Sequence, residues 1–197
     1  MKNTKLIFLH VLFLAPFLIG YGQSSTDLKT IKAYLNASTV EQKGRFMAED
    51  FHSYFAERKG KGEDKKKALA GFQQWDGHLH PDVAILSHEK KENGWLVYFN
   101  EQNDFSKLIG YPGWKASMWF SFDRQGLIMQ TIYFPDTTNL PYKKWLQPAV
   151  DWLKIHMPGE LNTVYQDNKL VKTEAAATKW KALLQKWRAQ RKEVNKE

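Results

Sequence analysis

Apolar residues recur every three or four positions near both ends of this chain and every second position in its middle. The helical spacing covers residues 28–35, 40–50 and 68–75, which predicts three amphipathic helices in the first part of the chain. The aromatic run at 51–55, between the second and third of them, has the composition of a strand. The N-terminal part is therefore expected to be mainly helical, with one short strand.

Beyond Pro81 the spacing changes to two, which predicts strands. They are expected from residue 83 onward and over 95–100, 115–122 and 127–134. The turns between them have hairpin chemistry, with Asn93-Gly94 in one and Asp123 to Gly126 in another. Helices followed by consecutive strands predict an α+β fold, in which N-terminal helices wrap a curved antiparallel sheet. Such a sheet leaves a concave mouth, a place where small molecules bind.

Residues 138–197 return to a helical spacing and predict two further helices. The last of them has an apolar stripe that contains Trp180 and Trp187. We interpret these tryptophans as anchors that pack onto the sheet; the alternative is a basic amphipathic helix that lies on a membrane. The expected organisation is one α+β domain over 23–137, with a helical extension over 138–197 packed on it.

Residues 1–22 have the anatomy of a cleavable signal peptide. Two lysines precede an apolar run at 6–19, and Gly20 and Gly22 place small residues before the expected cleavage site. The run is shorter than a membrane-spanning helix and is interrupted by Pro16, so no stable membrane span is expected. We expect an exported protein, periplasmic or secreted. It is not expected to be a lipoprotein, because lipidation needs a cysteine and the chain has none.

The 197 residues include 29 basic and 21 acidic side chains. Removal of residues 1–22 would take away two lysines and no acids, which lowers the net charge from +8 to +6. A basic excess of this size suits anionic neighbours or solubility, and nucleic acid is not an expected partner of an exported chain. The absence of cysteine excludes disulfides, thiol catalysis and thiolate-bound metals. No glycine-rich phosphate loop occurs, so no cofactor is expected.

Two motifs near the end of the predicted sheet are characteristic. Residues 122–128 (FDRQGLI) follow the pattern aromatic–Asp–x–x–Gly–apolar–Ile, and the next strand closes with Tyr133-Phe134-Pro135-Asp136. Together with the order of helices and strands before them, these motifs make residues 27–137 resemble the nuclear transport factor 2-like (NTF2-like) superfamily, and within it the SnoaL-like branch. The resemblance implies a cone, in which helices wrap a strongly bent sheet and a pocket opens at the wide end.

Members of this superfamily include polyketide cyclases, ketosteroid isomerases and dehydratases that work without metal or organic cofactor. Others are binding or dimerisation modules, so the fold leaves the function open. For the enzymatic members the resemblance implies a carboxylate or histidine as general base in an apolar cone, with a tyrosine, a tryptophan or a neutral acid that donates to the oxyanion.

Several residues of this chain have side chains suited to those roles. The candidate catalytic residues are His52, Tyr54 and Asp76. His52 and Tyr54 alternate onto one face of their strand, and the residues between and beside them compete with them for the inner face. The candidate ligand-binding residues are Trp75, His78, Trp119, Tyr133 and Asp136.

The segment from Asp76 to Asp82 holds the densest set of metal-ligating side chains, with His78 and His80 two residues apart. Gly77 and Pro81 favour a loop over a rigid strand there, and no further protein ligand is identified. No metal site is therefore expected.

Three functions are consistent with these observations. The favoured one is binding of a small apolar or aromatic molecule in the cone, because the predicted strands carry many tryptophans and tyrosines without a convincing acid–base set. The second is a cofactor-independent cyclase, isomerase or dehydratase that uses His52, Tyr54 or Asp76. The third is an interaction module, in which the open sheet or the last helix pairs with a second copy of the chain or with another protein.

Overall fold

The computed structural model of this chain describes residues 19–57 and 62–194. Most of the expected signal peptide, residues 1–18, lies outside the described residues. The expected cleavage point after Gly22 falls within helix α1 (Ile19–Leu35). Export therefore stays a prediction from the sequence. Within the described ranges, no helix is both long enough and apolar enough to cross a membrane.

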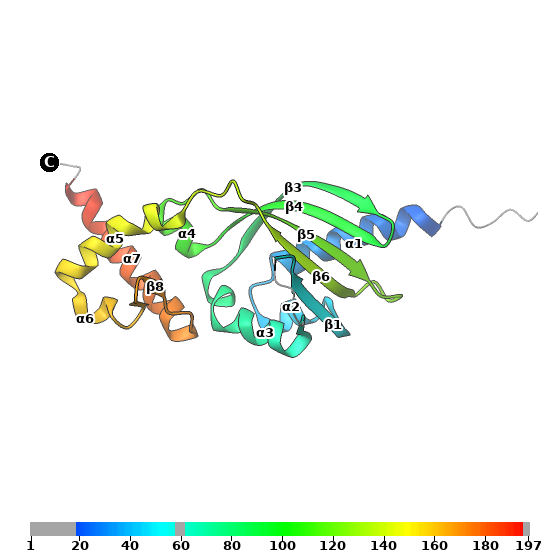
Figure 1. Cartoon of the computed structure of the whole chain (residues 1–197), viewed down its shortest axis with the longest axis horizontal. Coiled ribbons are helices and arrows are strands. Elements are labelled where there is room, and N and C mark those ends of the chain that lie inside the picture. Colours follow the sequence, from blue (N-terminus) through cyan, green and yellow to red (C-terminus); the bar gives the residue numbers. More distant parts are fainter. Residues whose placement is uncertain (1–18, 58–61, 195–197) are drawn as a thin grey trace, which may run out of the picture.

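The main sheet has six strands in the order β2-β1-β6-β5-β4-β3. Their bounds are β1 (Met47–Phe55), β2 (Glu63–Asp64), β3 (Asp82–Lys91), β4 (Gly94–Gln102), β5 (Trp114–Phe122) and β6 (Ile128–Pro135). The strands β3 to β6 form an antiparallel meander, and register shifts interrupt the pairing in β1, β3 and β5. Irregularities of this kind bend strands and strengthen their twist, which accounts for the curved sheet in Figure 1.

The predicted α+β class, with a curved sheet wrapped by N-terminal helices, is confirmed. One pairing differs from the prediction of an antiparallel sheet, because β1 and β6 run parallel. A parallel pair needs a long connection, and here the chain passes through the third helix and the whole meander between the two strands. The direction of β1 is thus not fixed by a hairpin.

Three helices cover the concave side of the sheet: α1, α2 (Val40–Gly44) and α3 (Lys65–Gln74). Ile31 and Tyr34 of α1 are buried in one apolar core with Phe51, Val97 and Phe120 of the sheet. This core fixes α1 against the strands.

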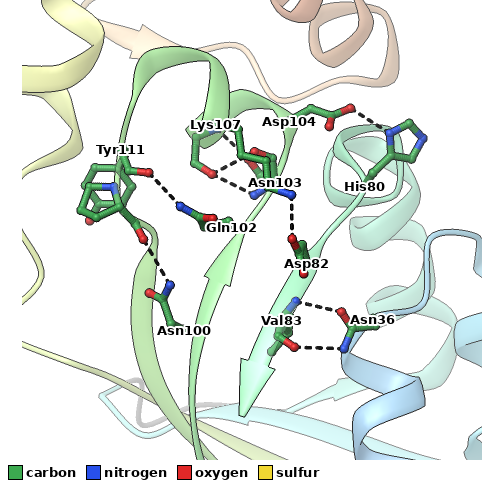
Figure 2. Close-up of polar contacts among 12 residues, drawn as sticks. Asn36, His80, Asp82, Val83, Asn100, Gln102, Asn103, Asp104, Lys107 and Tyr111 are labelled. Carbon is green, nitrogen blue, oxygen red and sulfur yellow. Dashed lines mark hydrogen bonds and ion pairs between the residues drawn. The ribbon is translucent and has the colours of Figure 1, made fainter. Parts of the chain in front are cut away.

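The end of α1 is also tied to the edge strand β3 by hydrogen bonds. The Asn36 side chain accepts a hydrogen bond from the Val83 N–H at 2.8 Å and donates one to the Val83 carbonyl at 3.2 Å (Figure 2). One amide side chain thereby takes the place of a neighbouring strand for this residue.

Two helical predictions need correction. The helix expected over 40–50 ends at Gly44, because Met47 already pairs with Ile128 in the sheet. The residues between the predicted strands 95–100 and 115–122, where no helix was predicted, contain helix α4 (Asp104–Ile109), which begins with a capping box formed by Asn103 and Ser106. Because both of these side chains are short and polar, the apolar spacing does not reveal them.

The C-terminal extension contains α5 (Tyr142–His156), α6 (Pro158–Leu161), a small hairpin of β7 (Tyr165–Gln166) and β8 (Lys169–Leu170), and α7 (Glu174–Val194). Figure 1 shows these elements at one end of the molecule, away from the beginning of α1. They build a second apolar core with α4 and with η1 (Asp76–Leu79), a single tight helical turn. Trp180 and Trp187 are buried in this core and so pack against helices rather than onto the sheet.

Trp180 is at the centre of the second core. Its side chain is 0% exposed, its Nε1 donates to the Val164 carbonyl at 3.0 Å, and its ring meets the edge of Phe105 at a centroid distance of 5.8 Å. Burial, a satisfied indole N–H and aromatic contacts all stabilise the docking of α7.

We expect Trp180→Ala to lower the free energy of unfolding by about 3–5 kcal/mol, because it leaves a large cavity in this core. Urea denaturation measured by circular dichroism would give the value. Trp145→Ala is the matched control, since Trp145 is 36% exposed, and it should cost about 1 kcal/mol or less. Equal losses in the two variants would contradict the assignment of Trp180 as the anchor of α7.

Candidate functional site

A cavity lies inside the curved sheet, at the end where β4 and β6 finish. It consists of two adjoining cavities of about 460 Å³ each. Both are lined by the same eight residues, Tyr34, Ser53, Phe55, Asp76, Glu101, Met118, Tyr133 and Lys172. We call this space the cone cavity. Its size falls in the range of roughly 300–1,000 Å³ that small-molecule sites occupy.

Strand alternation delivers the residues of the sheet to the cone cavity. Tyr133 of β6 lies between Phe55 of β1 and Met118 of β5 in the strand register, and the rings of Phe55 and Tyr133 are 5.4 Å apart. In β4 the buried residues Trp95, Val97 and Phe99 alternate along the inner face. Glu101 is the next member of that row, which places a carboxyl group at the mouth end of an otherwise apolar series.

Helices and the C-terminal extension supply the other walls. Asp76 begins η1, directly after the buried Trp75, and Lys43 lies in α2. The extension contributes Tyr142, Leu170 and Lys172 to the lining. The cone cavity is therefore bounded by both apolar cores of the molecule.

The two carboxyl groups of the cavity are hard to ionise. Burial raises the pKa of Glu101 to about 7; the neighbouring Asp76 acts in the same direction, and Lys43 opposes them. Burial also raises the pKa of Asp76, against the pull of Lys172 and Lys43. Asp76 is exposed where it lines the cavity, so its carboxyl group keeps part of its water, and the surrounding walls account only for the direction of the shift in its pKa.

Lys43 is the half-buried base of the same site. Burial lowers the pKa of its amine to about 8, while Glu101 and Asp76 partly restore it. Its Nζ donates to the Tyr34 carbonyl at 3.1 Å and stands 4.0 Å from the centre of the Tyr34 ring and 4.7 Å from that of Phe72. Two aromatic faces thus replace much of the water around this cation.

Two tyrosine hydroxyls complete the polar lining. Burial raises the pKa of Tyr34, and burial together with Glu101 and Asp76 raises the pKa of Tyr133. Both hydroxyls stay protonated at neutral pH and can donate a hydrogen bond to a ligand. The cone cavity thus combines proton donors with a carboxyl group and an amine that both change protonation near neutral pH.

Three of the residues suggested by the sequence line the cone cavity: Trp75, Asp76 and Tyr133. His52 and Tyr54 lie on the opposite face of β1, because Ser53 and Phe55 take the inner positions. His52 is exposed and its ring lies 6.3 Å from that of Tyr54.

The other three suggested residues lie outside the lining. Trp119 alternates with the inward Met118 and therefore belongs to the outer face of the sheet. His78 lies 3.5 Å from a carboxylate oxygen of Glu174 in α7. Asp136 accepts hydrogen bonds from the backbone N–H and the hydroxyl of Thr138, so it stabilises the turn after β6.

The histidines and aspartates of the segment 76–82 point to different partners. His80 Nδ1 lies 2.8 Å from Asp104 Oδ2, which also pairs with Lys181 at 2.5 Å (Figure 2 shows the contact of His80). Asp82 pairs with Lys107 at 2.7 Å. Among the side chains that the structure places, no three His, Cys, Asp or Glu gather in a way that could hold a metal ion.

Sequence reasoning missed Glu101, Lys43, Lys172 and Tyr34. A signal for Glu101 was present, because the period of two in residues 95, 97 and 99 continues to 101 and places its side chain on the core face. Lys43 and Lys172 carry no such signal. Their positions depend on contacts between segments far apart in the sequence, which spacing along one element does not reveal.

Searches of protein-family models and of characterised proteins find no match. Solved structures do match. Delta 5-3-ketosteroid isomerase from Mycobacterium sp. is 14% identical, with a TM-score of 0.46, 60% of this chain covered and 97% of the other. An NTF2-like protein of unknown function from Cytophaga hutchinsonii is 13% identical, with a TM-score of 0.43 and coverages of 58% and 89%.

A computationally designed 17-OHP binder is 12% identical, with a TM-score of 0.44 and coverages of 57% and 94%. These proteins are similar to this chain in fold alone. The matching structures include proteins described as NTF2-like, and they do not single out a branch of that superfamily.

The raised pKa of Glu101 makes the stability of the protein depend on pH. Between the ordinary glutamate pKa, about 4.3, and about 7, the folded state holds a proton that the unfolded state has lost, so rising pH destabilises the fold. We expect Glu101→Gln to remove this effect. The free energy of unfolding of the variant minus that of the wild type should increase by up to about 1.4 kcal/mol per pH unit in that window and should stay constant above it.

Urea denaturation at a series of pH values would measure the difference. Glu92→Gln is the matched control, because Glu92 is exposed in the turn between β3 and β4, and its difference from the wild type should not change with pH. If the difference in free energy of unfolding between Glu101→Gln and the wild type does not change with pH, the carboxyl group of Glu101 is not desolvated.

Proposed function

We propose that this protein is exported and that it binds a small, largely aromatic or apolar molecule carrying one polar group in the cone cavity. The observation that carries the proposal is a cavity with aromatic walls and a few ionisable groups at one position. The aromatic walls are formed by Tyr34, Trp75, Phe105, Trp114, Tyr133 and Tyr142. The proposal of export rests on the sequence of residues 1–22.

The aromatic and the polar parts of the lining would contribute to the binding free energy in different ways. Aromatic side chains remove its apolar body from water, at about 25 cal/mol per Å² of buried surface. The polar lining then favours a ligand with one hydrogen-bonding group, which Tyr133, Glu101 or Lys43 can meet. A wholly apolar ligand would leave these groups without water or a partner, at an energetic cost.

Ser53 offers a direct test, because it is small, half-buried and part of the lining. We expect Ser53→Phe to fill part of the cavity and to weaken the binding of naphthylmethanol at least about tenfold, measured by calorimetry, since overlap with the new ring removes contacts. The adjacent His52→Phe is the matched control. It places the same phenyl ring on the other face of β1, in place of an imidazole ring, and should leave the affinity unchanged.

Equal losses in the two variants would contradict binding in the cone cavity. Absence of wild-type binding to naphthylmethanol and to its apolar and ketone analogues would contradict the proposed function as a whole. Circular dichroism of both variants would show that the fold is retained.

A second function is favoured by Glu101. A carboxyl group with a pKa of about 7 is poised to accept a proton from carbon at neutral pH, and Tyr133 lines the same cavity as a hydrogen-bond donor for the oxyanion that forms. The second candidate is therefore a cofactor-independent enzyme that moves a proton next to a carbonyl group. In this reading Glu101, rather than His52 or Tyr54, is the general base.

Proton abstraction can be measured without knowledge of the natural substrate. We expect the wild type to accelerate the exchange of the acidic C–H protons of phenylacetone for deuterium, followed by nuclear magnetic resonance in heavy water. The rate should rise with pH and level off above about 7, where Glu101 is ionised. Glu101→Gln should lower it about a hundredfold or more, while His52→Gln should not change it. Identical rates for wild type and Glu101→Gln would exclude Glu101 as the base.

A further inference from the structure

Lys43 is a nucleophilic group that ligand binding alone does not require. Its amine lies at the wall of the cone cavity, on the side formed by α2, α3 and η1. The rings of Tyr34 and Phe72 flank it at 4.0 and 4.7 Å, and one hydrogen bond to the Tyr34 carbonyl orients it. The amine is therefore held in place beside the space that a ligand would fill.

The surroundings of Lys43 disfavour its charged form. Desolvation lowers the pKa of the amine to about 8, so that about a tenth of the molecules carry a neutral amine at pH 7. An exposed lysine with a pKa of about 10.4 is neutral in fewer than about one molecule in a thousand at that pH. Lowering of the pKa by desolvation in an apolar pocket is one way in which proteins activate lysine as a nucleophile.

Two acids and a second base share the cavity with this amine. Glu101 and Asp76 favour its charged form, and Lys172 interacts with Asp76 on the side of the extension. The pKa of Glu101, about 7, keeps a substantial share of its carboxyl group protonated at neutral pH. An amine and a carboxyl group whose neutral forms are both favoured by desolvation thus line the same cavity.

We propose that the Lys43 amine forms an imine with the aldehyde or ketone group of a ligand in the cone cavity, with Glu101 as the proton donor. This inference rests on the proposed function, since it needs the ligand to enter the same cavity. It narrows the ligand to an aromatic or apolar molecule with a reactive carbonyl group. The aromatic walls would hold the body of such a molecule while its carbonyl carbon faces Nζ.

The reaction balances with the groups that are present. The Nζ lone pair attacks the carbonyl carbon, the carbon–oxygen double bond becomes single, and a proton moves from nitrogen to oxygen to give a carbinolamine. Glu101 then protonates the hydroxyl group, the carbon–oxygen bond breaks and water leaves. The product is an iminium cation on Lys43 in the same cavity as the Glu101 carboxylate, and the two opposite charges attract each other.

Reductive trapping tests the imine directly in the wild-type protein. Naphthaldehyde with sodium cyanoborohydride at pH 7, in phosphate buffer, converts an imine into a stable secondary amine that peptide mapping by mass spectrometry locates. We expect Lys43 to be modified at least about tenfold faster than exposed lysines such as Lys66, because more of its amine is neutral. Modification spread evenly over the lysines would overturn the proposal.

Variants separate the chemistry from the binding. Lys43→Met keeps the length of the side chain and suits the two flanking rings, and it should abolish the fast adduct, whereas Lys66→Met should leave it unchanged. Glu101→Gln should slow adduct formation at Lys43, and calorimetry with naphthylmethanol would show how far the same variant still binds a ligand. An unchanged rate in Glu101→Gln would overturn its role as the proton donor.

Naphthylmethanol has no carbonyl group and cannot form an imine. It therefore separates the proposed binding in the cone cavity from the proposed imine at Lys43. Binding of this alcohol without a Lys43 adduct from naphthaldehyde would leave the proposed function standing and refute the imine. Failure of both would refute both. Binding of the alcohol together with a fast Lys43 adduct would support both.

Discussion

The bend of the main sheet is the constraint on which the rest of this structure depends. Register shifts in β1, β3 and β5 curve the strands, so that side chains on the concave face converge. The sheet cannot fill that concave space alone, and α1 fills one part of it with Ile31 and Tyr34. The remainder, toward the end of β4, is the cone cavity. Cavity and core are thus two outcomes of the same curvature.

The C-terminal extension connects this cavity to a second core. Its helices bury Trp180 and Trp187 against α4 and η1, two elements that lie much earlier in the sequence. The segment between β8 and α7, held by this packing, brings Lys172 to the cavity, where the lysine favours the ionised form of Asp76. Docking of α7 therefore bears on the electrostatics of the site as well as on stability, because displacement of the extension would remove that positive charge and open one wall.

Much of the fold could be predicted from the sequence, because each strand of the meander follows a period of two and its turns have hairpin residues. The parallel pairing of β1 with β6 could not, since no local signal fixes the direction of a strand that lacks a hairpin to its neighbour. Helix α4 could not be predicted from apolar spacing either. It is defined by the polar capping pair Asn103 and Ser106 rather than by an apolar stripe.

The candidate site was predicted only in part, and the reason lies in how its residues are positioned. Trp75, Asp76 and Tyr133 were suggested by residue type and do line the cavity, whereas the choice between the two faces of β1 needed the partner strands. Glu101 could have been found by following the apolar row of β4 one step further. Lys43 could not, because its place beside Tyr34 and Phe72 depends on the packing of α2 between two other helices.

Glu101 and Lys43 both oppose the pattern that stabilises the fold. An apolar residue at either position would avoid the cost of removing a charge from water, and Glu101 continues a row of β4 that is otherwise apolar. Departures of this kind concentrate at functional sites, because desolvation there shifts pKa values further than it could for an exposed pair. Here it moves the pKa of the acid up and that of the amine down, so that the two approach each other near neutral pH. A proton can then pass between acid, ligand and amine with little change in free energy, which is the physical condition for the acid–base chemistry of this cavity.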